Sequence, residues 1–249
     1  MKVSIITPAY NSGNYILKTY ESIKNQTYID WEWLVTDDRS TDNTLMILNE
    51  LAKKDSRVRV YSNSENSGAA VSRNNSLTHA SGKFIAFIDS DDVWLPNKLE
   101  QQIEFMSEDI AFSFTAYELI DSDGNALNRT VDTSQKGCFT YNDMLRKSAT
   151  LGCSTVMLRR DCFDEISMPL IRTGQDYALW LKLLKTGHNA YVLNKVFTQY
   201  RILPDSISRN KVRKAIRQWE IYRKIEKLDL LSSSVNFCFY AFRAIFRKC

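Results

Sequence analysis

Short apolar runs alternate with segments of helical period along the first half of the chain. Runs rich in branched and aromatic residues predict buried strands, and they lie at residues 3–7, 31–36, 57–62 and 84–88. Segments with apolar residues three or four positions apart predict helices, and they follow at 15–26, 40–54, 69–80 and 96–106. Strands that alternate with helices form parallel sheets covered on both faces. The pattern therefore predicts an α/β fold built on a single doubly wound, mostly parallel sheet.

Acidic residues follow two of the predicted strands. The fourth strand leads directly into Asp89, Asp91 and Asp92, and the second strand is followed by Asp37 and Asp38. Ligands of open parallel sheets bind beside the carboxyl ends of the strands, so we expect both clusters at one crevice. Carboxylates this close repel each other unless a cation or a hydrogen-bond donor lies between them. Hard oxygen ligands of this kind suit Mg²⁺ or Mn²⁺.

Each acidic cluster also has a structural explanation. A D-x-D pattern is common, and a solvated turn that caps the next helix explains residues 89–92 about equally well. Ser40 or Thr41 is the predicted N-cap of the helix over 40–54, and Asp42 suits a structural role at the same helix start. Asp38 is the better ligand candidate because it lies closer to the end of its strand.

Five segments of the chain match one enzyme family. They are "SIITPAYN", "VTDDRSTDNT", "NSGAAVSRN", "FIAFIDSDDVWLP" and "GQDYALWLKLL". In order and rough spacing they resemble the motifs of the family 2 glycosyltransferases, which have the GT-A fold. Each motif is weak alone, but five in register make the resemblance specific over about residues 1–205.

The resemblance implies a nucleotide site. Pro8, Tyr10 and Asp38 match the family positions that contact the uracil of a UDP-sugar, and a planar ring with a hydrogen-bond acceptor suits that base. Asp89 matches the position near the ribose, and Arg73 matches a basic residue whose guanidinium suits phosphate oxygens. The structural alternatives are a half-buried aromatic residue at Tyr10 and a solvated helix position at Arg73. The register of the five motifs favours the functional interpretation.

The reaction implied by the resemblance is a single displacement that inverts the anomeric carbon. Asp91 matches the ligand of Mn²⁺ or Mg²⁺, which neutralises the diphosphate, and Asp176 matches the base that takes the acceptor proton. Residues 153–160 would line the donor sugar. Trp94 or Trp180 could stack on the acceptor, although both could equally belong to the core, and core is favoured for Trp180.

Three positions depart from the family pattern. Arg39 stands where Gly is frequent, Gln175 where Glu is frequent, and Leu203 where a His can assist the metal. The last departure puts a second protein ligand of the metal in doubt. His79 and His188 do not fill that position, and both are expected at the surface or at helix ends.

Size and composition fit one substantial globular domain. The chain has 249 residues, of which 44% are apolar, and this is enough to bury a large core. Its five cysteines include no C-x-x-C pair, so they predict neither a disulfide framework nor a zinc site. The apolar run after Met1 is too short for a signal peptide, and no stretch reaches the length of a bilayer span. A cytoplasmic protein is expected.

The positive charge is concentrated at the C-terminal end. Residues 209–249 contain 11 Lys or Arg and 3 Asp or Glu, a balance of +8, while the whole chain carries +4. We therefore divide the chain into a glycosyltransferase domain, 1–208, and a basic tail, 209–249. Amphipathic helices predicted at 211–228 and 235–248 fit peripheral contact with the inner face of the cell membrane. The alternative, packing on the domain, is nearly as favoured for 211–228 and less favoured for 235–248.

The sequence thus predicts an inverting, metal-dependent glycosyltransferase. Its donor is expected to be a UDP-sugar, and its acceptor a hydroxyl of a lipid-linked, lipopolysaccharide or capsule-type glycan. Two alternatives are a non-catalytic sugar-nucleotide binding module and, less favoured, a D-x-D phosphatase, whose nucleophile would follow the first strand, where this chain has "TPAYN". Nothing resembles a nucleic-acid-binding motif, so no nucleic-acid partner is expected.

Overall fold

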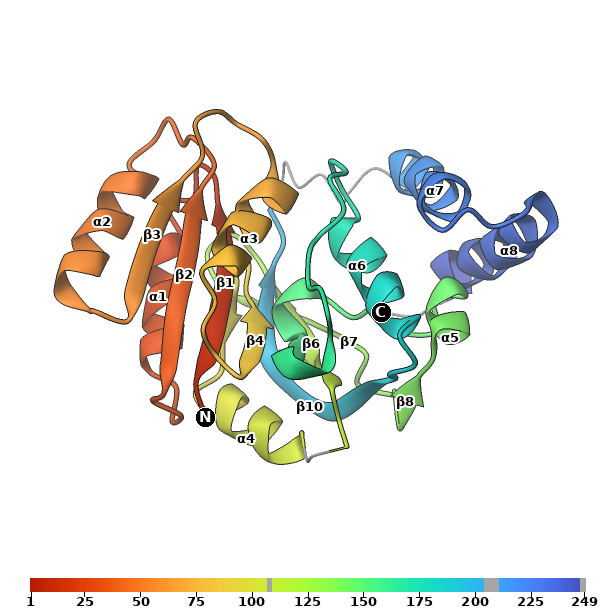
Figure 1. Ribbon diagram of the computed structural model, residues 1–249, viewed down its shortest axis with the longest axis horizontal. Helices are drawn as coiled ribbons and strands as arrows, with labels where there is room; N and C mark the ends of the chain where they lie inside the picture. The colour runs from red at the N-terminus through yellow and green to blue at the C-terminus, as the bar shows by residue number, and fades with distance from the viewer. Residues whose placement is uncertain (107–108, 204–210, 247–249) are drawn as a thin grey trace.

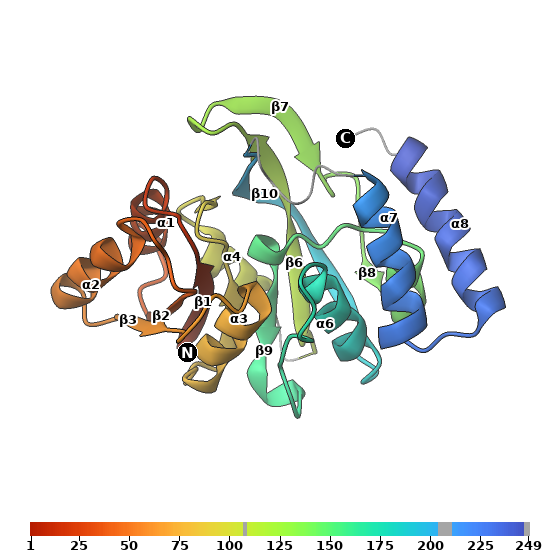
Figure 2. The ribbon, with the colours of Figure 1, turned by 90° about the horizontal axis from the view of Figure 1, so that it is seen from above.

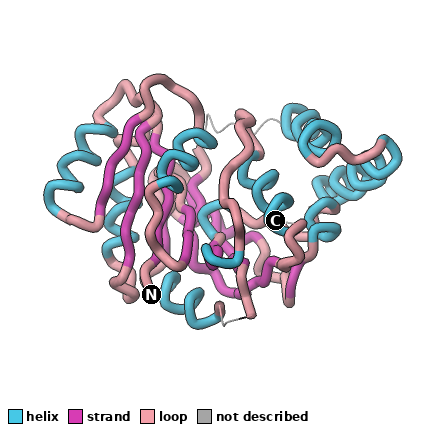
Figure 3. The backbone as a smooth tube through the Cα atoms, viewed as in Figure 1, coloured by secondary structure: helices cyan, strands magenta, loops and turns pink. Residues whose placement is uncertain are grey.

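One sheet runs through the whole molecule, with helices on both of its faces. The structure is a computed structural model that describes residues 1–106, 109–203 and 211–246. In this part of the chain the strand order is β3-β2-β1-β4-β9-β6-β10-β5, with β7 beside β6 and β8 beside β10. Figure 3 shows the strands as one layer between helices and long loops. The predicted α/β class with a mostly parallel sheet is confirmed.

The first half of the chain is a run of alternating strands and helices (Figure 1). Its four strands pair in parallel and are β1 (Val3–Ala9), β2 (Trp31–Asp37), β3 (Val58–Ser62) and β4 (Phe84–Phe87). Its four helices are α1 (Ile16–Lys24), α2 (Thr44–Lys54), α3 (Ala69–Thr78) and α4 (Lys98–Phe105). All eight elements were predicted within a few residues, because their apolar spacing matches the two helix and strand periods.

The start of α2 differs from the prediction. Its N-cap is Asn43 rather than Ser40 or Thr41, and the Asn43 side chain makes no capping hydrogen bond. The Asp42 side chain caps the helix start instead, since its Oδ1 accepts from the Thr44 backbone N–H at 3.0 Å. The structural role expected for Asp42 is confirmed.

The second half of the chain completes the sheet with mixed pairing. Its strands are β6 (Phe112–Ile120), β7 (Ala126–Val131), β8 (Cys138–Phe139), β9 (Met157–Arg159) and β10 (Ala190–Arg201). The short strand β5 (Val93–Trp94), which follows β4 in the first half, pairs with β10 in the antiparallel direction. Its helices are α5 (Tyr141–Leu145) and α6 (Gln175–Leu184). The short strand β9 is antiparallel to both β4 and β6, and it joins the two halves of the sheet.

Two apolar cores lie on opposite faces of the sheet. In Figure 2 the sheet separates α1 and α4 from α3 and α6. Side chains of α1, α2 and α4 pack with Trp31, Trp33 and Trp94 in one core. Side chains of α3, α5 and α6 pack with Phe87 and Trp180 in the other. Burial on both faces explains why the central strands are continuously apolar.

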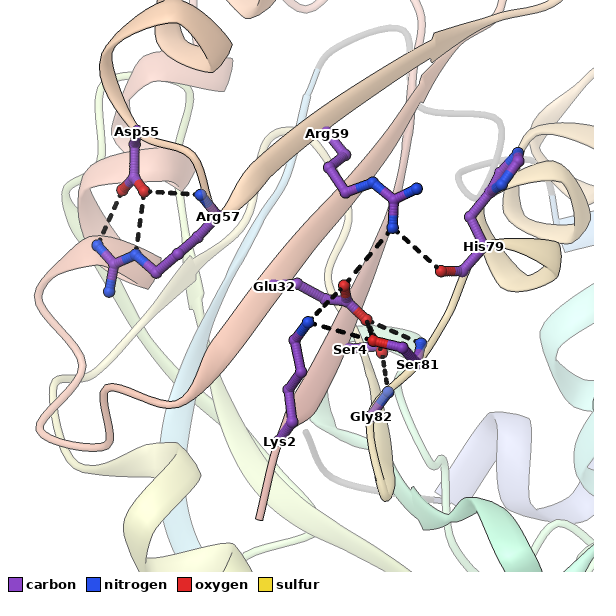
Figure 4. A network of polar contacts seen from close by, with 9 residues as sticks. All are labelled: Lys2, Ser4, Glu32, Asp55, Arg57, Arg59, His79, Ser81 and Gly82. Atoms are coloured by element: carbon purple, nitrogen blue, oxygen red, sulfur yellow. Dashed lines mark hydrogen bonds and ion pairs between the residues drawn. The ribbon is translucent and has the colours of Figure 1, made fainter.

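The amino ends of the strands are closed by a polar network (Figure 4). The Glu32 side chain on β2 is almost fully buried and accepts from Ser4 Oγ at 2.6 Å and from the Ser81 backbone N–H at 2.8 Å. Lys2 Nζ lies 2.9 Å from the same carboxylate. Burial alone would raise the pKa of Glu32, but the hydrogen bonds from Ser4, Lys2 and Ser81 outweigh it and lower the pKa to about 2. At this end of the sheet the buried carboxylate is therefore satisfied internally.

The C-terminal helices pack against the sheet domain. They are α7 (Lys211–Glu220), a π-helical segment (Ile221–Ile225) and α8 (Leu230–Phe246). Tyr222 in the π-helical segment is fully buried, and Arg243 on α8 donates to the Arg146 carbonyl at 2.8 Å. Both predicted tail helices thus contact the domain, including the second, for which packing was less favoured. The predicted boundary between 208 and 209 lies outside the described residues.

Candidate functional site

Loops at the carboxyl ends of β1, β2 and β4 carry most of the predicted site residues. Pro8 lies near the end of β1 and is half-buried, and Tyr10 directly follows the strand with 50% of its surface exposed. Asp38 follows β2, and its backbone N–H donates to the Ala9 carbonyl at 2.7 Å. This bond fixes the first two loops beside each other. The exposed ring of Tyr10 offers a flat face that a planar ligand could stack on.

Asp38 anchors the loop that leads into α3. Its Oδ1 accepts from the Ser67 backbone N–H at 2.9 Å and from Asn63 Nδ2 at 2.8 Å, and its Oδ2 accepts from the Gly68 backbone N–H at 2.7 Å. A carboxylate has about four acceptor positions. These three hydrogen bonds leave about one acceptor position, on Oδ2, for a hydrogen-bond donor of a ligand.

Arg73 is a buried cation at the centre of the site. It lies on α3, its Nη2 pairs with the Asp89 carboxylate after β4, and its Nη1 approaches Met168 Sδ at 3.9 Å. Burial alone would lower the pKa of Arg73, but electrostatic interactions with Cys153 and with the carboxylates of Asp89 and Asp176 outweigh it and raise the pKa. Arg73 Nε is buried without a hydrogen-bond partner among the described residues. A solvated position, the structural alternative for Arg73, is therefore wrong.

The two aspartates that follow Asp89 differ in their surroundings. Asp92 is buried and structural, since its carboxylate accepts from Ser154 Oγ and from the Arg201 backbone N–H at 2.9 Å. The Asp91 side chain is only partly covered, and burial together with the charge of Asp89 raises its pKa to about 6. Burial and the charges of Asp91 and Asp89 also raise the pKa of Asp92, but its carboxylate is buried and held by hydrogen bonds. Of these two aspartates, Asp91 is therefore the one whose carboxylate is accessible to a cation.

The residues of this loop fit a divalent ion that takes few protein ligands. Within the described residues no group of three or more His, Cys, Asp or Glu side chains is arranged around one point. Leu203, where the family pattern can have a His, follows β10 and offers no ligand atom from its side chain. Mg²⁺ and Mn²⁺ are often held by one or two carboxylates and substrate phosphates. Asp91 beside Asp89 suits that arrangement.

Asp176 reaches the same site from the other half of the chain. It lies in the first turn of α6, and its charge is close enough to Arg73 to contribute to the pKa of that residue. The preceding side chain, Gln175, is nearly buried, and its Oε1 has no hydrogen-bond partner in the described chain. The structure therefore places Asp176, on α6, within electrostatic range of the ion pair that Arg73 on α3 forms with Asp89 after β4.

The two tryptophans considered as acceptor contacts are core residues. Trp94 and Trp180 are both buried, with Trp94 Nε1 donating to the Ser154 carbonyl at 2.7 Å and Trp180 Nε1 donating to the Leu151 carbonyl at 3.2 Å. Neither can stack on an acceptor without rearrangement, and core is confirmed for Trp180. Residues 153–160 form a 3₁₀ turn followed by β9 and are mostly buried.

Two residues have a supporting role that was not predicted. Ser154 Oγ bridges the loop, because it accepts from the Asp89 backbone N–H at 3.0 Å and donates to Asp92. Arg201 ends β10, is almost fully buried, and its Nε donates to the Asp91 carbonyl at 2.8 Å. The available signal was weak: an Arg at the end of a long strand that mixes apolar and polar residues. Both residues fix the backbone that presents Asp89 and Asp91.

Comparisons with known proteins identify the family. The family described as "Glycosyl transferase family 2" matches residues 4–167 of this chain. TuaG of Bacillus subtilis, named for teichuronic acid biosynthesis, is 44% identical over 247 residues, which cover 99% of this chain and 97% of TuaG. WfgD of Escherichia coli, a UDP-Glc:α-D-GlcNAc-diphosphoundecaprenol β-1,3-glucosyltransferase, is 42% identical over 222 residues, which cover 88% of this chain and 84% of WfgD.

Solved structures share the fold. S. aureus TarS 1–349 in complex with UDP-GlcNAc superposes with a TM-score of 0.76 at 22% identity, covering 99% of this chain and 73% of that one. The mannosyltransferase PcManGT of Pyrobaculum calidifontis, in complex with GDP-Man and Mn²⁺, superposes with a TM-score of 0.70 at 17% identity, covering 98% and 70%. At these identities the likeness concerns the fold alone.

Proposed function

Because the chain belongs to glycosyl transferase family 2, we propose that it transfers a sugar from a UDP-sugar to a hydroxyl of a lipid-linked sugar, with inversion at the anomeric carbon. The observation that carries this proposal is the convergence of Asp176, Arg73 and Asp89 at one edge of the sheet. This family assignment leaves the phosphatase and the non-catalytic binding module without support.

The nucleotide would be held by residues at the ends of β1, β2 and β4. Tyr10 would stack on the uracil beside Pro8, and the remaining acceptor position of Asp38 would receive the uracil N–H. Asp89 would accept from the ribose hydroxyls, and Arg73, with an unpartnered Nε, would attract the diphosphate. The Tyr10 ring is exposed and Arg73 Nε has no partner among the described residues, so the protein itself leaves both groups unused.

The acceptor would approach the donor sugar from the side opposite to the leaving diphosphate. The acceptor oxygen attacks C1, the bond from C1 to the diphosphate oxygen breaks, UDP leaves, and the acceptor proton passes to the Asp176 carboxylate. A divalent ion held by Asp91 would supply charge neutralisation for the departing diphosphate. Arg73 would add a second, permanent positive charge close to the same atoms.

The acceptor proposal comes from the relatives. WfgD and WfaP of Escherichia coli are both named for transfer of glucose to GlcNAc-diphosphoundecaprenol. A membrane-embedded acceptor of this kind requires the enzyme to work at the bilayer surface. The described residues contain no helix long and apolar enough to cross a membrane. We propose peripheral contact with the membrane instead. The contact would be made by an exposed apolar face of α8, which consists of Leu231, Val235, Phe239 and Phe242 and is called the α8 face.

Cations lie near the α8 face in the sequence and on the neighbouring helix. The tail from residue 209 carries a balance of +8, and Arg213, Lys214 and Arg223 are exposed. Apolar side chains beside cations suit a helix lying among anionic headgroups. The domain contacts of α8 include Arg243, which donates to the Arg146 carbonyl, and the Phe239 ring at one edge of the α8 face, which lies 5.0 Å from the Arg146 guanidinium. Leu231, Val235 and Phe242 are exposed, so packing on the domain and membrane contact are compatible.

A donor panel tests the first part of the proposal. UDP-glucose, UDP-galactose, UDP-GlcNAc and GDP-mannose are incubated with Mn²⁺ and without acceptor, and the released nucleotide is measured. We expect slow hydrolysis of one or more UDP-sugars, with UDP-glucose the first candidate, and none of GDP-mannose. Faster hydrolysis of GDP-mannose would contradict the uracil contacts assigned to Tyr10 and Asp38.

Asp176→Asn tests the proposed base. Asparagine can still serve at a helix start, so folding should be retained, but an amide cannot accept the acceptor proton. We expect transfer to fall at least about a hundredfold while Mn²⁺-dependent UDP affinity is unchanged. Gln175→Glu, the neighbouring change to the more frequent family residue, is the control and should alter the rate far less. A wild-type rate for Asp176→Asn would show that the base lies elsewhere.

A further inference from the structure

The C-terminal helices contact the backbone that carries the proposed base. Gly174, the residue before α6, has a left-handed φ of +77°. A Cβ on Gly174 would lie 3.1 Å from Ile221 Cδ1 and 3.5 Å from Arg217 Cγ. Side chains from α7 and the π-helical segment therefore close directly on the chain two residues before Asp176. No side-chain cap holds this end of α6, so its position depends on contacts from outside the helix.

Two buried tyrosines attach the start of α6 and the π-helical segment to the same place. Tyr177, the residue after Asp176, donates its hydroxyl to the Met144 carbonyl at 2.9 Å. Tyr222 donates its hydroxyl to the Leu145 carbonyl. Met144 and Leu145 are consecutive residues at the end of α5. The first turn of α6 is thus fixed relative to the tail through two adjacent peptide units.

The π-helical turn allows the tail to hold α6 at its far end as well. The Glu226 backbone N–H donates to the Ile221 carbonyl at 2.9 Å, which is the wide i to i−5 spacing of a π-helix. Tyr222 and the Glu226 side chain both face the domain, and the Glu226 carboxylate pairs with Lys185 immediately after α6. Isolated π turns are uncommon and occur frequently at functional sites.

We infer that the π-helical segment is a positioning element for the catalytic base, with Tyr222 as its principal positioning residue. The inference rests on the proposed function, in which Asp176 takes the acceptor proton. A general base must lie within hydrogen-bond reach of the proton it removes, and a displacement of about 1 Å can cost about a hundredfold in rate. The tail would then set the turnover number and leave donor binding to β1, β2, α3 and β4.

Tyr222→Phe tests the inference, with Tyr240→Phe as its matched control. Tyr222→Phe keeps the ring and removes the hydroxyl that reaches Leu145, while Tyr240 lies on α8 with its ring 5.6 Å from Phe237. Kinetics use the UDP-sugar that the wild type hydrolyses fastest in the donor panel. We expect kcat to fall about tenfold for Tyr222→Phe, with KM and the UDP dissociation constant unchanged, and no change for Tyr240→Phe.

A second pair of variants tests the contact at Gly174 itself. Gly174→Ala adds a methyl group against Ile221 and should lower kcat by at least about tenfold. Adding Ile221→Val removes the contacting Cδ1 atom, and we expect it to recover at least about threefold of that loss. Ile225→Val, the same change one turn further along the segment, is the control and should recover nothing. Calorimetric UDP stoichiometry gives the folded fraction, so misfolding is separated from slow turnover.

Two results would overturn the inference. The first is that Tyr222→Phe lowers thermal stability while kcat per folded molecule stays at the wild-type value. The other is recovery by Ile225→Val as large as that by Ile221→Val. If Tyr222→Phe does not fold, the Gly174 pair decides the question. Wild-type turnover in Asp176→Asn would instead refute the proposed base, whatever the tail variants show.

Discussion

The buried side chain of Lys98, which lies over the Trp94 ring, leads to a prediction about stability. Lys98 begins α4 and is fully buried, with its Nζ donating to Gln102 Oε1 at 2.8 Å and lying 4.1 Å from the centre of the Trp94 ring. Burial lowers the pKa of Lys98 from 10.5 to about 7. The start of a helix also disfavours a positive charge. Replacement by methionine keeps the length and apolar stem of the side chain and removes the charge.

The size of the effect follows from linkage. One pKa unit corresponds to about 1.4 kcal/mol, so burying the Lys98 ammonium costs up to roughly 5 kcal/mol below pH 7. The Trp94 ring offsets up to about 2 kcal/mol of this cost. Lys98→Met also leaves Gln102 Oε1 without its donor, which costs about 1–3 kcal/mol. We expect Lys98→Met to be more stable than wild type by about 1 kcal/mol at pH 6.

The sign of this difference should change with pH. The unfolded chain binds more protons than the folded one between pH 7 and 10.5, so wild-type stability gains a contribution as pH rises through this window. Lys98→Met lacks the contribution and should become the less stable protein near pH 9. Urea unfolding at pH 6, 7, 8 and 9 measures the crossover, and Lys53→Met, at an exposed residue of α2, is the control. A stability difference that does not vary with pH would refute the reasoning.

Three further predictions concern the site and the tail. Asp91→Ala should abolish both turnover and the Mn²⁺ dependence of UDP binding in calorimetry, and full turnover in EDTA would exclude the metal role. Because burial and Asp89 raise the pKa of Asp91 to about 6, the carboxylate is protonated below that pH, and Mn²⁺ affinity should fall about tenfold per pH unit there; constant affinity down to pH 5 would contradict this. Replacing Leu231 and Val235 on the α8 face by serine should weaken binding to vesicles containing phosphatidylglycerol, leave donor hydrolysis intact, and act together with added salt; unchanged vesicle binding would remove the membrane proposal.

The sequence predicted the elements of the first half well and their partners poorly. Apolar spacing identifies β4 as a strand, but it carries no information that β9, some 70 residues later, will pair with it in the antiparallel direction. The same limit applies to the tail. Its amphipathic pattern favoured a membrane, least strongly for residues 211–228, and was also consistent with a protein surface. The burial of Tyr222 and the hydrogen bond from Arg243 to the Arg146 carbonyl reveal that the tail packs on the domain. Periodicity reports which face is apolar and not what covers it.

The candidate site shows a similar division. Asp89, Arg73 and Asp176 were predicted from motifs, and the fold places them close together. The sequence is consistent with either an acceptor-binding or a core role for Trp94, because an aromatic residue after a strand suits both roles. The buried hydrogen bond from its Nε1 to the Ser154 carbonyl shows that Trp94 is a core residue. Arg201 was missed because its work is done by backbone and guanidinium hydrogen bonds to another loop, which leave no spacing pattern in the chain.

The antiparallel strand β9 has a consequence during synthesis. The edge of β4 that pairs with it, Phe84–Phe87, is made only of apolar residues, and its partner begins at Met157. At ordinary translation rates a gap of this length lasts about 4 to 14 s. Throughout this time the nascent chain presents an unpaired apolar strand edge, the feature that most readily recruits other chains. Newly made protein should therefore depend on chaperones until the centre of the sheet closes, and fragments that end between α4 and β9 should be recovered as aggregates.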